Sequence, residues 1–377
     1  MNTIVLGSNH YNTLGLIWSL GKAGHRVTLL IYDDKNLYVT KSKYITRTII
    51  IHESDNVIEL IKTISHELNK PVVLVSSDVD ATLLNDHYQE LVDCCLFEGG
   101  RPDGSINKYR NKDAGNELAL KCGFTLPKNI VVGSSQELDL DGFHFAILIK
   151  ANNSIHGGKA AMKKCDTHEE VKQFVNSLPD DFFPIQVQEF IEKDYEIMLL
   201  GCSLYGGKIV ICPIANKKIR QFPKYVGLGS WSESVEVEGN EDLEKLANKV
   251  MQYMKEIEYT GNFSAEFLYS KGKYYFLEIN LRNDGTSWLS TSSGYNLPDL
   301  VCRSFVDDDV TTEGYTYTKK YFMNIFADVH YVRDGSIKLF HWLRQFNRHT
   351  CYSNYNKLDR RPFWYYCIPI IKHSLFK

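Results

Sequence analysis

The sequence predicts an α/β fold for the N-terminal part of the chain and an α+β fold for the part that follows it. Two observations carry this prediction. Short apolar runs alternate with helical stripes up to about residue 105, and beyond that point strand-like segments outnumber helical ones. With 377 residues the chain is long enough for about two to three domains.

The N-terminal part reads as an open parallel sheet covered by helices. Each apolar run is followed by a helical stripe, and this alternation is typical of parallel strands with crossover helices. The predicted elements are strands at 3–7, 26–31, 47–51 and 71–75 and helices at 13–23, at 57–68 and from near Asp80. A polar stretch over 101–113 looks like the link to the next part.

The remaining sequence predicts helices and a larger number of strands. We expect helices at 112–122, 167–178 and 241–257, and strands at 129–133, 144–151, 158–163, 185–191, 195–204, 207–215, 261–269 and 273–280. The last two strands are joined by the tight turn SKG. A polar stretch that contains Gly227 and Gly229 separates the meander from the helix at 241–257.

Composition excludes several classes of protein. The formal net charge of −3, from 43 Lys and Arg against 46 Asp and Glu, argues against nucleic acid as a main partner. Nine cysteines without a C-x-x-C spacing, including the neighbours Cys94 and Cys95, suit thiols in a reducing cytoplasm. The start MNTIVLGSNHYN lacks the features of a signal peptide, and the longest uncharged apolar stretch, 363–371, is too short to span a membrane.

Three oxygen-bearing side chains on the last two predicted strands point to a metal site. Glu266 lies on one strand, and Glu278 and Asn280 lie two positions apart on the other, so these two share a face. Neighbouring carboxylates repel each other unless a cation lies between them, and hard oxygen ligands suit Mg²⁺. Arg282 follows on the same face and could hold an anion. The alternative interpretation is a solvated strand face with two unrelated acids.

Two further features suggest phosphate binding. Lys150 ends the apolar strand FAILIK, and His156, Gly157, Gly158 and Lys159 form a glycine loop whose N–H groups could surround a phosphate. Most such glycine pairs are surface turns, which is the alternative here. At the first strand-to-helix turn, GSNHYNTLG lacks a dinucleotide motif. Asn9, His10 and Asn12 could contact a small molecule there, and helix capping explains Asn12 or Thr13 equally well.

Taken in order, these residues resemble the ATP-grasp superfamily, and within it the stand-alone carbamoyl-phosphate-synthase-like and amino-acid ligase branch. VSSDVDATLLNDHYQEL with Asp78 and KKIRQFPKYVGLGS carry the resemblance to this branch. The usual proline before the motif arginine is Leu281, and the glycine loop is shorter than in biotin carboxylase relatives. The resemblance covers residues 1 to about 305 and implies a pre-ATP-grasp domain at 1–105, a first grasp lobe at 106–190, a second lobe at 191–305 and a C-terminal extension at 306–377.

The resemblance also implies site residues. It assigns the phosphates of ATP to Lys112, Lys150 and the loop His156 to Lys159, adenine to Glu189, Phe190 and Ile191, ribose to Glu196, metal to Glu266, Glu278 and Asn280, and the transferred phosphoryl group to Arg282. In the implied reaction Arg282, with Arg220 as a second candidate, would stabilise the carboxylate oxygen as its charge shifts. Arg220 could instead be a surface cation, and Asp284 beyond the motif could face the acceptor or belong to a loop.

The implied activity is ATP-dependent, ADP-forming ligation. With Mg²⁺ (or Mn²⁺), ATP would phosphorylate a small carboxylate such as an amino acid, and an amine would attack the acyl phosphate. Two alternatives stay open: a nucleotide-binding sensor or scaffold without turnover, and a kinase that stops at a phosphorylated product.

The C-terminal segment 335–377 is basic and aromatic. Eight Lys and Arg residues stand against Asp359 alone, so the segment carries +7 and the rest of the chain −10, and ten aromatic residues accompany those charges. One interpretation is a surface that contacts a membrane or a glycan. The other is that the segment packs on the acidic remainder or on a second subunit of a homodimer.

Overall fold

The computed structural model describes residues 1–151, 162–224 and 227–375. The chain forms two compact units, each assembled from separate stretches of sequence. The first comprises Met1–Asn107, Ile197–Ala265 and Ile279–Lys377, and the second comprises Lys108–Glu196 and Glu266–Glu278.

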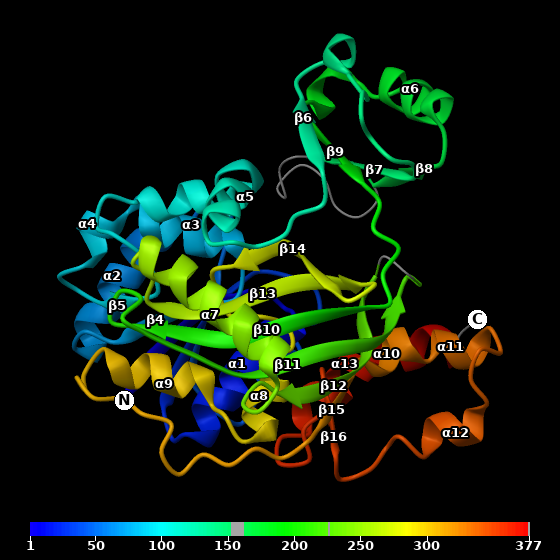
Figure 1. The fold of residues 1–377 in the computed structure, drawn as a ribbon. Helices are drawn as coiled ribbons and strands as arrows, with labels where there is room; N and C mark the ends of the chain where they lie inside the picture. Colours follow the sequence, from blue (N-terminus) through cyan, green and yellow to red (C-terminus); the bar gives the residue numbers. More distant parts are fainter. Residues whose placement is uncertain (152–161, 225–226, 376–377) are drawn as a thin grey trace. The chain divides into compact units, whose positions relative to one another are not determined.

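The N-terminal sheet belongs to the first unit and has five parallel strands in the order β3-β2-β1-β4-β5 (Figure 1). Its elements are β1 (Asn2–Gly7), α1 (Tyr11–Lys22), β2 (Arg26–Tyr32), η1 (Val39–Lys41), β3 (Ile45–Ile51), α2 (Val57–Leu68), β4 (Val72–Val75), α3 (Asp78–Asp86), α4 (Tyr88–Leu91) and β5 (Leu96–Phe97). The predicted open parallel sheet is confirmed, and the chain order reverses where β1 lies between β2 and β4.

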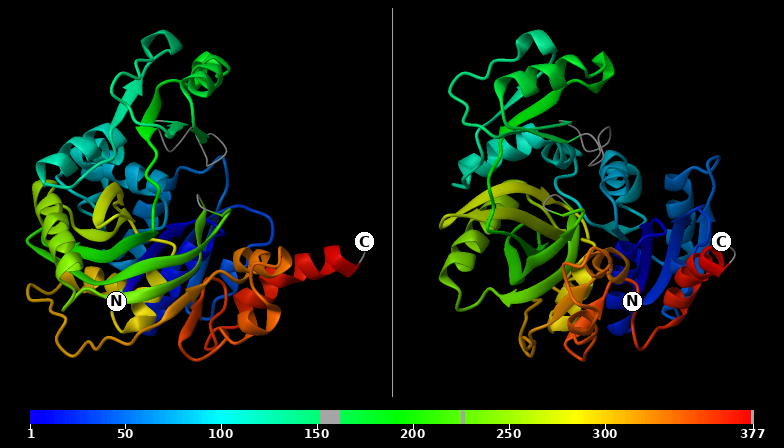
Figure 2. Two further views of the ribbon diagram at one scale, coloured as in Figure 1. Left: turned by 45° about the vertical axis from the view of Figure 1, so that its right-hand side comes forward. Right: turned by 90° about the vertical axis from the view of Figure 1, so that its right-hand side faces the viewer.

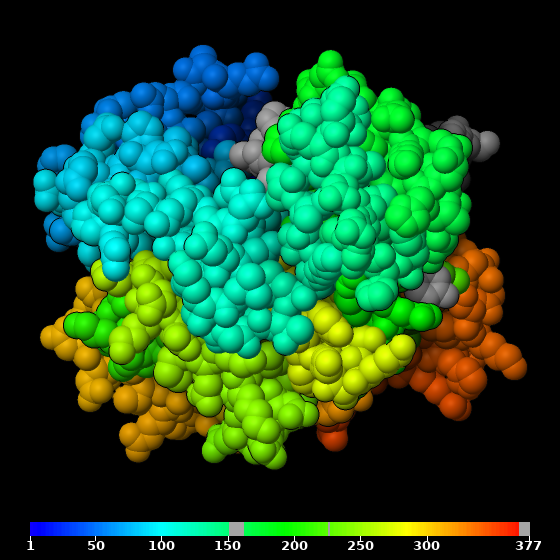
Figure 3. Space-filling model, turned by 45° about the horizontal axis from the view of Figure 1, so that its top comes forward, coloured from blue at the N-terminus to red at the C-terminus, as the bar shows by residue number. Residues whose placement is uncertain are grey.

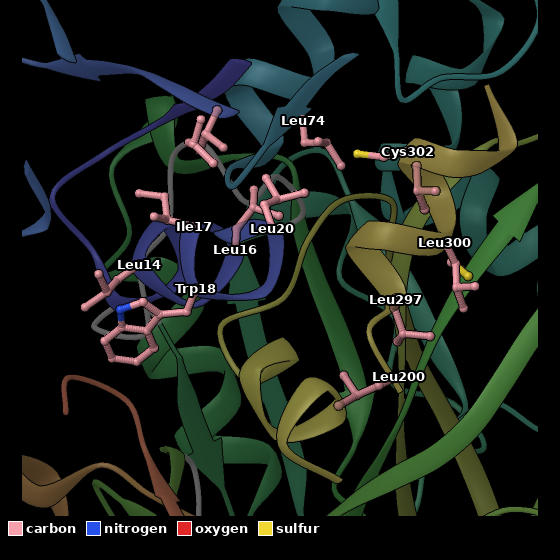
Figure 4. Packing of buried hydrophobic residues seen from close by; sticks show 14 of the residues in the cluster. Leu14, Leu16, Ile17, Trp18, Leu20, Leu74, Leu200, Leu297, Leu300 and Cys302 are labelled. Atoms are coloured by element: carbon pink, nitrogen blue, oxygen red, sulfur yellow. The ribbon is translucent and has the colours of Figure 1, made fainter. Parts of the chain in front are cut away.

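Helix α1 is the centre of the largest core cluster. All residues from Asn12 to Leu20 are buried, which differs from the single apolar stripe expected of a surface helix. Figure 4 shows Leu14, Ile17 and Trp18 of α1 among the side chains of this cluster, which α8 (Ser287–Ser293) and α9 (Leu297–Ser304) also line. Burial of each large apolar side chain contributes about 1.5–3 kcal/mol, so this helix ties the sheet to distant parts of the sequence.

A seven-stranded sheet runs in the order β14-β13-β10-β11-β12-β15-β16. Its strands are β10 (Tyr195–Leu204), β11 (Ile209–Phe222), β12 (Leu228–Glu236), β13 (Gly261–Ser270), β14 (Lys273–Asn280), β15 (Tyr321–Met323) and β16 (Thr350–Tyr352). Helix α7 (Glu241–Glu256) buries Leu243, Val250 and Met254 while its charged outer face, yellow-green in Figure 3, lies on the surface.

The polar stretch that contains Gly227 and Gly229 forms strand β12, which the sequence analysis did not predict. In β12 the inward positions are Ser230, Ser232 and Ser234, all fully buried, and Ser230 Oγ donates a hydrogen bond to Asp328 Oδ1 at 2.8 Å. Buried and more exposed residues do alternate along β12. The buried positions, however, hold small polar residues instead of the apolar side chains by which a strand is recognised in a sequence.

The second unit contains a four-stranded antiparallel sheet in the order β6-β9-β7-β8. Its elements are α5 (Lys112–Lys121), β6 (Asn129–Val132), η3 (Ser135–Glu137), β7 (Ile147–Ala151), β8 (Lys163–Cys165), α6 (His168–Asn176), η5 (Asp180–Phe182) and β9 (Ile185–Glu189), and η2 (Ser105–Arg110) precedes α5. Most of the predicted strand 158–163 lies outside the described residues.

The C-terminal segment is built into the first unit. It contributes α10 (Ile325–Asp328), α11 (His330–Arg333), α12 (Leu339–Leu343) and α13 (Arg361–Leu375). Strand β15 pairs with β12 and β16 pairs with β15, and Asp359 accepts a hydrogen bond from Trp18 Nε1 of α1 at 3.0 Å. Helix α13 contacts η1. In the right-hand view of Figure 2 this red helix lies beside the blue N-terminal part of the chain. None of the helices in the described residues is both long and apolar enough to cross a bilayer.

Candidate functional site

Lys150 is held on the polar face of the small sheet in the second unit. Along β7, Ile147 and Ile149 are fully buried on one face, so Lys150 emerges on the other. The neighbouring strand β9 presents Gln186 directly opposite Lys150, and Lys150 Nζ donates a hydrogen bond to Gln188 Oε1 at 2.9 Å. These two glutamines, buried on a polar face, are functional candidates that the sequence reasoning missed; the alternation in IQVQE is the signal that could have found them.

The electrostatics of Lys150 identify two more members of this group. Burial, together with the smaller effect of the Lys112 charge, lowers the pKa of Lys150 to about 8, and the carboxylate of Glu278 opposes the shift. Lys112 and Glu278, which belong to the second unit like Lys150, therefore each act on the charge of Lys150. Two lysines against one carboxylate leave a local excess of positive charge, which an anion would relieve.

Lys112 occupies an electrostatically unfavourable position. It is the first residue of α5, whose N-cap is Asn111: the Asn111 side chain accepts a hydrogen bond from the backbone N–H of Asp113 at 2.9 Å. The N-terminus of a helix carries a partial positive charge and stabilises anions rather than cations. A lysine there, acting on a second and buried lysine, is therefore better explained by a bound anion than by stability of the fold.

The segment predicted to hold adenine and ribose follows β9. The carboxylate of Glu189 accepts a hydrogen bond from the backbone N–H of His144 at 3.1 Å, and the Phe190 N–H donates to Ala146 O at 2.8 Å. Glu196 forms an ion pair with Lys193. These contacts fix the segment from Glu189 through Ile191 to Glu196 locally, and its role in nucleotide binding stays a prediction.

The predicted metal ligands lie on a tight hairpin. Lys271 and Gly272 both have positive φ, 48° and 81°, as a type I′ turn requires, and they connect β13 to β14. Glu278 and Asn280 are two positions apart on β14 and so share a face, whereas Glu266 lies on β13.

The donor set of these residues fits a hard cation. Two carboxylates and an amide oxygen are ligands that Mg²⁺ accepts. Asn280 Oδ1 accepts a hydrogen bond from Arg282 Nη2 at 3.1 Å, and Asn280 Nδ2 donates to Ser264 Oγ at 3.3 Å, which orients the amide. Within the described residues no three His, Cys, Asp or Glu side chains gather as a metal cluster, so metal binding by Glu266, Glu278 and Asn280 stays a prediction.

Arg282 belongs to a second polar group, which lies entirely within the first unit. Arg282 Nε and Nη2 both donate to Asp78 Oδ2, at 3.0 and 2.9 Å, and the Arg282 side chain is only 16% exposed. Asp78 is the first residue of α3, directly after the N-cap Ser77, and so lies at the carboxyl end of β4. The ion pair fixes the direction of the guanidinium at the edge of the sheet where α/β proteins bind ligands.

His10, Tyr11 and Asp284 complete this group. Burial lowers the pKa of His10, the charge of Asp284 opposes the shift, and the charge of Arg282 adds to it. The pKa of Tyr11 rises to about 12 because of burial and the charge of Asp284, and Lys218 partly offsets this. Tyr11 packs directly on Gly285, where a Cβ would lie 2.8 Å from the ring. Tyr11 and Lys218 lie in the stretches GSNHYNTLG and KKIRQFPKYVGLGS, but nothing in those stretches singled them out as site residues.

His10 also caps α1, which the sequence attributed to Asn12 or Thr13. His10 Nδ1 accepts a hydrogen bond from the backbone N–H of Asn12 at 3.2 Å, and Asn12 Nδ2 instead donates to Ser76 O and Asn283 O. A neutral imidazole that accepts at Nδ1 carries its proton on Nε2. His10 therefore offers one N–H donor to whatever lies beside it.

Arg220 is surrounded by partners of its own. It donates to Asp328 Oδ1 and Oδ2 at 2.9 and 2.6 Å and to Gln345 Oε1 at 2.7 Å, and Asp328 is fully buried. Its charge is neutralised in this arrangement, so a role in stabilising the carboxylate oxygen of the substrate stays a prediction. The glycine loop of His156, Gly157, Gly158 and Lys159 lies outside the described residues.

Comparison with known proteins places this geometry in a family. Residues 117–293 match the model of the ATP-grasp domain. The chain is 24% identical to a D-aspartate ligase from Enterococcus faecium, over 79% of this chain and 75% of the relative. It is 22% identical to the carbamoyl phosphate synthase large chain of Saccharolobus solfataricus, over 59% of this chain and 21% of that much longer relative.

Solved structures share the fold at low sequence identity. An L-amino acid ligase from Bacillus licheniformis superposes with a TM-score of 0.65 at 12% identity, over 85% of this chain and 79% of the other. A biotin carboxylase–βγ-ATP complex from Campylobacter jejuni gives 0.67 at 15% identity, over 85% and 74%. The comparisons confirm the predicted fold class, the resemblance to this superfamily and the prediction of an ATP-grasp ligase. Residues 117–293 of the chain therefore form an ATP-grasp domain.

Proposed function

We propose that this protein joins a small carboxylate, such as an amino acid, to an amine, and that it does so by way of an acyl phosphate formed from ATP. The observation that carries the proposal is the group of Lys112, Lys150 and Glu278, in which a buried lysine has a pKa of about 8 beside a second lysine. Such a group is costly for the fold and is suited to a polyphosphate.

The two lysines would neutralise the phosphates of ATP during transfer. Lys150 is oriented by Gln188, and Lys112 projects from the first turn of α5, so both charges are held in place before ATP arrives. The glycine loop with His156 and Lys159 would add further donors, and Glu189 to Ile191 with Glu196 would hold the nucleoside. Phosphoryl transfer requires charge neutralisation and alignment rather than a protein nucleophile.

Glu266, Glu278 and Asn280 would hold Mg²⁺ or Mn²⁺. A bound divalent ion supplies Lewis-acid stabilisation of the phosphate oxygens. The hydrogen bond from Arg282 to Asn280 orients the amide for this role, and Asp78 fixes Arg282 in turn.

The first unit supplies groups for an amino-acid substrate. Arg282 and the Nε2–H of His10 are donors that suit a carboxylate, and Asp284 is an anion that suits an ammonium group. The names of two similar proteins, a D-aspartate ligase and an L-amino acid ligase, favour amino acids as the substrate class.

The proposed reaction balances in two steps. A carboxylate oxygen attacks the γ-phosphorus of ATP and ADP leaves, which gives the acyl phosphate. The amine nitrogen then attacks the acyl carbon, inorganic phosphate leaves with the carboxylate oxygen, and the nitrogen loses a proton to solvent as the amide forms.

The test is nucleotide and phosphate release from Mg·ATP with pooled carboxylates, with and without pooled amines. We expect ADP and phosphate to appear only when both pools are present. Glu278→Gln should abolish release, because it removes a carboxylate beside the lysine pair, and Glu256→Gln on the exposed face of α7 is the matched control that should keep it.

Three outcomes would contradict the proposal. AMP release would exclude the acyl-phosphate route. A phosphorylated product that accumulates without any amine requirement would identify a kinase. ATP binding without turnover across both pools would identify a sensor or scaffold.

A further inference from the structure

The C-terminal segment presents a surface that the ligase reaction does not use. Four aromatic side chains in the described residues are more than a third exposed, and all four lie in this segment: Phe340 (64%), Phe346 (37%), Trp364 (57%) and Tyr365 (48%). Exposed aliphatic side chains accompany them, namely Leu339, Leu343, Leu358 and Ile368. Such a concentration of apolar surface on one segment marks an interaction site.

A series of ring contacts links two of the exposed aromatic residues, Phe346 and Trp364. Ring contacts run from Trp342 of α12 through Phe346, Tyr352, Tyr355 and Phe363 to Trp364 of α13, with centroids 4.7 to 5.7 Å apart. The two helices therefore present their exposed side chains from a packed support rather than from separate loops. We call this surface, residues 338–368, the aromatic platform.

The ionic side chains that the platform exposes are all basic. Its six described cations are Lys338, Arg344, Arg348, Lys357, Arg360 and Arg361. All six are exposed, and none of them forms an ion pair with a carboxylate in the part of the chain that the structure describes. The single acid, Asp359, is 2% exposed and is used internally by Trp18. The partner of this surface is therefore an anion.

A groove at the edge of α13 extends the surface. It has a volume of about 340 Å³ and is lined by Asn36, Leu37, Lys41, Tyr365 and Ile368. The Lys41 ammonium lies 5.0 Å from the centre of the Tyr365 ring, so a cation stands over an apolar floor. This combination fits an amphipathic anion, with its charge at Lys41 and its apolar part against Leu37 and Ile368.

We propose that the aromatic platform binds the surface of a bilayer that contains anionic lipids. Trp, Phe and Leu side chains gain free energy by entering the interfacial layer, and basic side chains beside them are attracted to anionic headgroups. A glycan or nucleic acid would use the cations and rings but would leave Leu339, Leu343 and Leu358 in water, whereas a bilayer covers them. The apolar side chains therefore favour lipid over a soluble polyanion.

Vesicle co-sedimentation of the full chain tests the proposal. We expect binding to phosphatidylcholine/phosphatidylglycerol vesicles, weak binding to phosphatidylcholine alone, and weaker binding at high ionic strength. Neutralising three cations, in Lys338→Gln/Arg344→Gln/Arg361→Gln, should weaken binding about 100-fold, at about fivefold for each charge near the membrane. Phe340→Ser/Trp364→Ser should weaken it at every ionic strength.

Matched variants elsewhere in the chain serve as controls. Lys172, Lys208 and Lys255 are exposed, and Lys172→Gln/Lys208→Gln/Lys255→Gln removes the same charge. Val306→Ser/Met251→Ser likewise removes exposed apolar side chains outside the platform. Both controls should bind vesicles as the unchanged protein does.

The proposal is overturned if the unchanged protein ignores anionic vesicles, or if the control and platform variants lose binding equally. Heparin binding without vesicle binding would identify a soluble polyanion as the ligand instead. A dimer in light scattering that the platform variants dissociate, again without vesicle binding, would identify a second copy of the chain as the partner.

Discussion

Lys150 shows most clearly how function conflicts with stability at the scale of one residue. Its pKa of about 8 lies below its usual value of 10.5, so between these two values the folded protein binds fewer protons than the unfolded chain does. The free energy of unfolding must therefore rise with pH across this window, and the cost of the buried charge is fully present below pH 8. An ATP site explains why such a residue is kept.

Lys150→Met should separate these two effects. We expect the free energy of unfolding at pH 7 to rise by about 1–3 kcal/mol, because the buried charge is removed. At the same time kcat/KM for ATP should fall by about 100-fold or more, because a preorganised cation is lost.

In the unchanged protein, kcat/KM for ATP should decline above about pH 8 as Lys150 loses its proton. Unfolding by denaturant measures the stability of Lys150→Met, and pH–rate profiles measure kcat/KM for ATP. A Lys150→Met variant that is less stable than the unchanged protein would contradict the explanation by a buried charge.

His10 allows its two roles to be tested separately. His10→Asn keeps a side chain that caps helices well but removes the Nε2–H, so stability should be unchanged while KM for the carboxylate or amine rises about tenfold. His10→Ala removes the cap as well and should cost a further ~1 kcal/mol of stability. Thermal unfolding and steady-state kinetics of His10→Asn and His10→Ala separate the capping role from the role of the Nε2–H donor. Equal kinetics in His10→Asn and the unchanged protein would restrict His10 to its capping role.

Some of the site residues could be predicted from the sequence, and others could not. Lys112, Lys150 and Glu278 could be selected from an ordered motif, and the structure does bring these three together. Tyr11 and Lys218 could not, because a residue that acts through its charge needs no fixed spacing along the chain. Gln188, which orients Lys150, could have been found from the alternation in IQVQE.

At the scale of elements, the hairpin of β13 and β14 carries the predicted metal ligands. Its register depends on a two-residue turn in which Lys271 adopts φ of 48°, a conformation that suits Asn much better than Lys. We expect Lys271→Asn to raise the free energy of unfolding by about 0.5–1 kcal/mol without loss of activity. Gly272→Ala, at φ of 81°, should instead lower it by about 1 kcal/mol. Chemical denaturation of both variants measures these changes. If the free energy of unfolding changed in the same direction in both variants, the proposed turn conformation would be contradicted.

Elements with apolar periodicity could be predicted, and those with buried polar faces could not. Helices α2 and α7 follow their predicted ranges because three- and four-residue apolar spacing marks one face. Strand β12 was missed because Ser230, Ser232 and Ser234 fill its inward positions, and their partners, such as Asp328, lie far along the chain.

At the scale of the whole molecule, Asp359 ties the C-terminal segment to the first helix. Its carboxylate accepts hydrogen bonds from Trp18 Nε1, Ser42 Oγ and the Lys43 N–H while nearly fully buried. Asp359→Ala should leave these donors without an acceptor and lower the free energy of unfolding by about 2–4 kcal/mol. Chemical denaturation measures this, with the exposed Asp308→Ala as control. A loss below 1 kcal/mol would mean that solvent replaces the carboxylate.

The order of α/β and α+β parts was predictable from the sequence because it depends on local alternation, which a chain of this length repeats many times. The addition of β15 and β16 to the large sheet was not, because three-residue strands carry too little pattern. The same integration means that removal of residues 339–377 would strip β16 and α13 from the first unit, so point variants are the sounder probe of the aromatic platform.

The central claim is that ATP activates a carboxylate as an acyl phosphate. Once pooled substrates have identified the carboxylate, it should be supplied with ¹⁸O in its carboxyl group, and the released phosphate and nucleotide should be analysed by mass spectrometry. We expect one ¹⁸O atom in each inorganic phosphate and none in the nucleotide, because the carboxylate oxygen leaves with the phosphoryl group. Label in AMP, or phosphate without label, would contradict it.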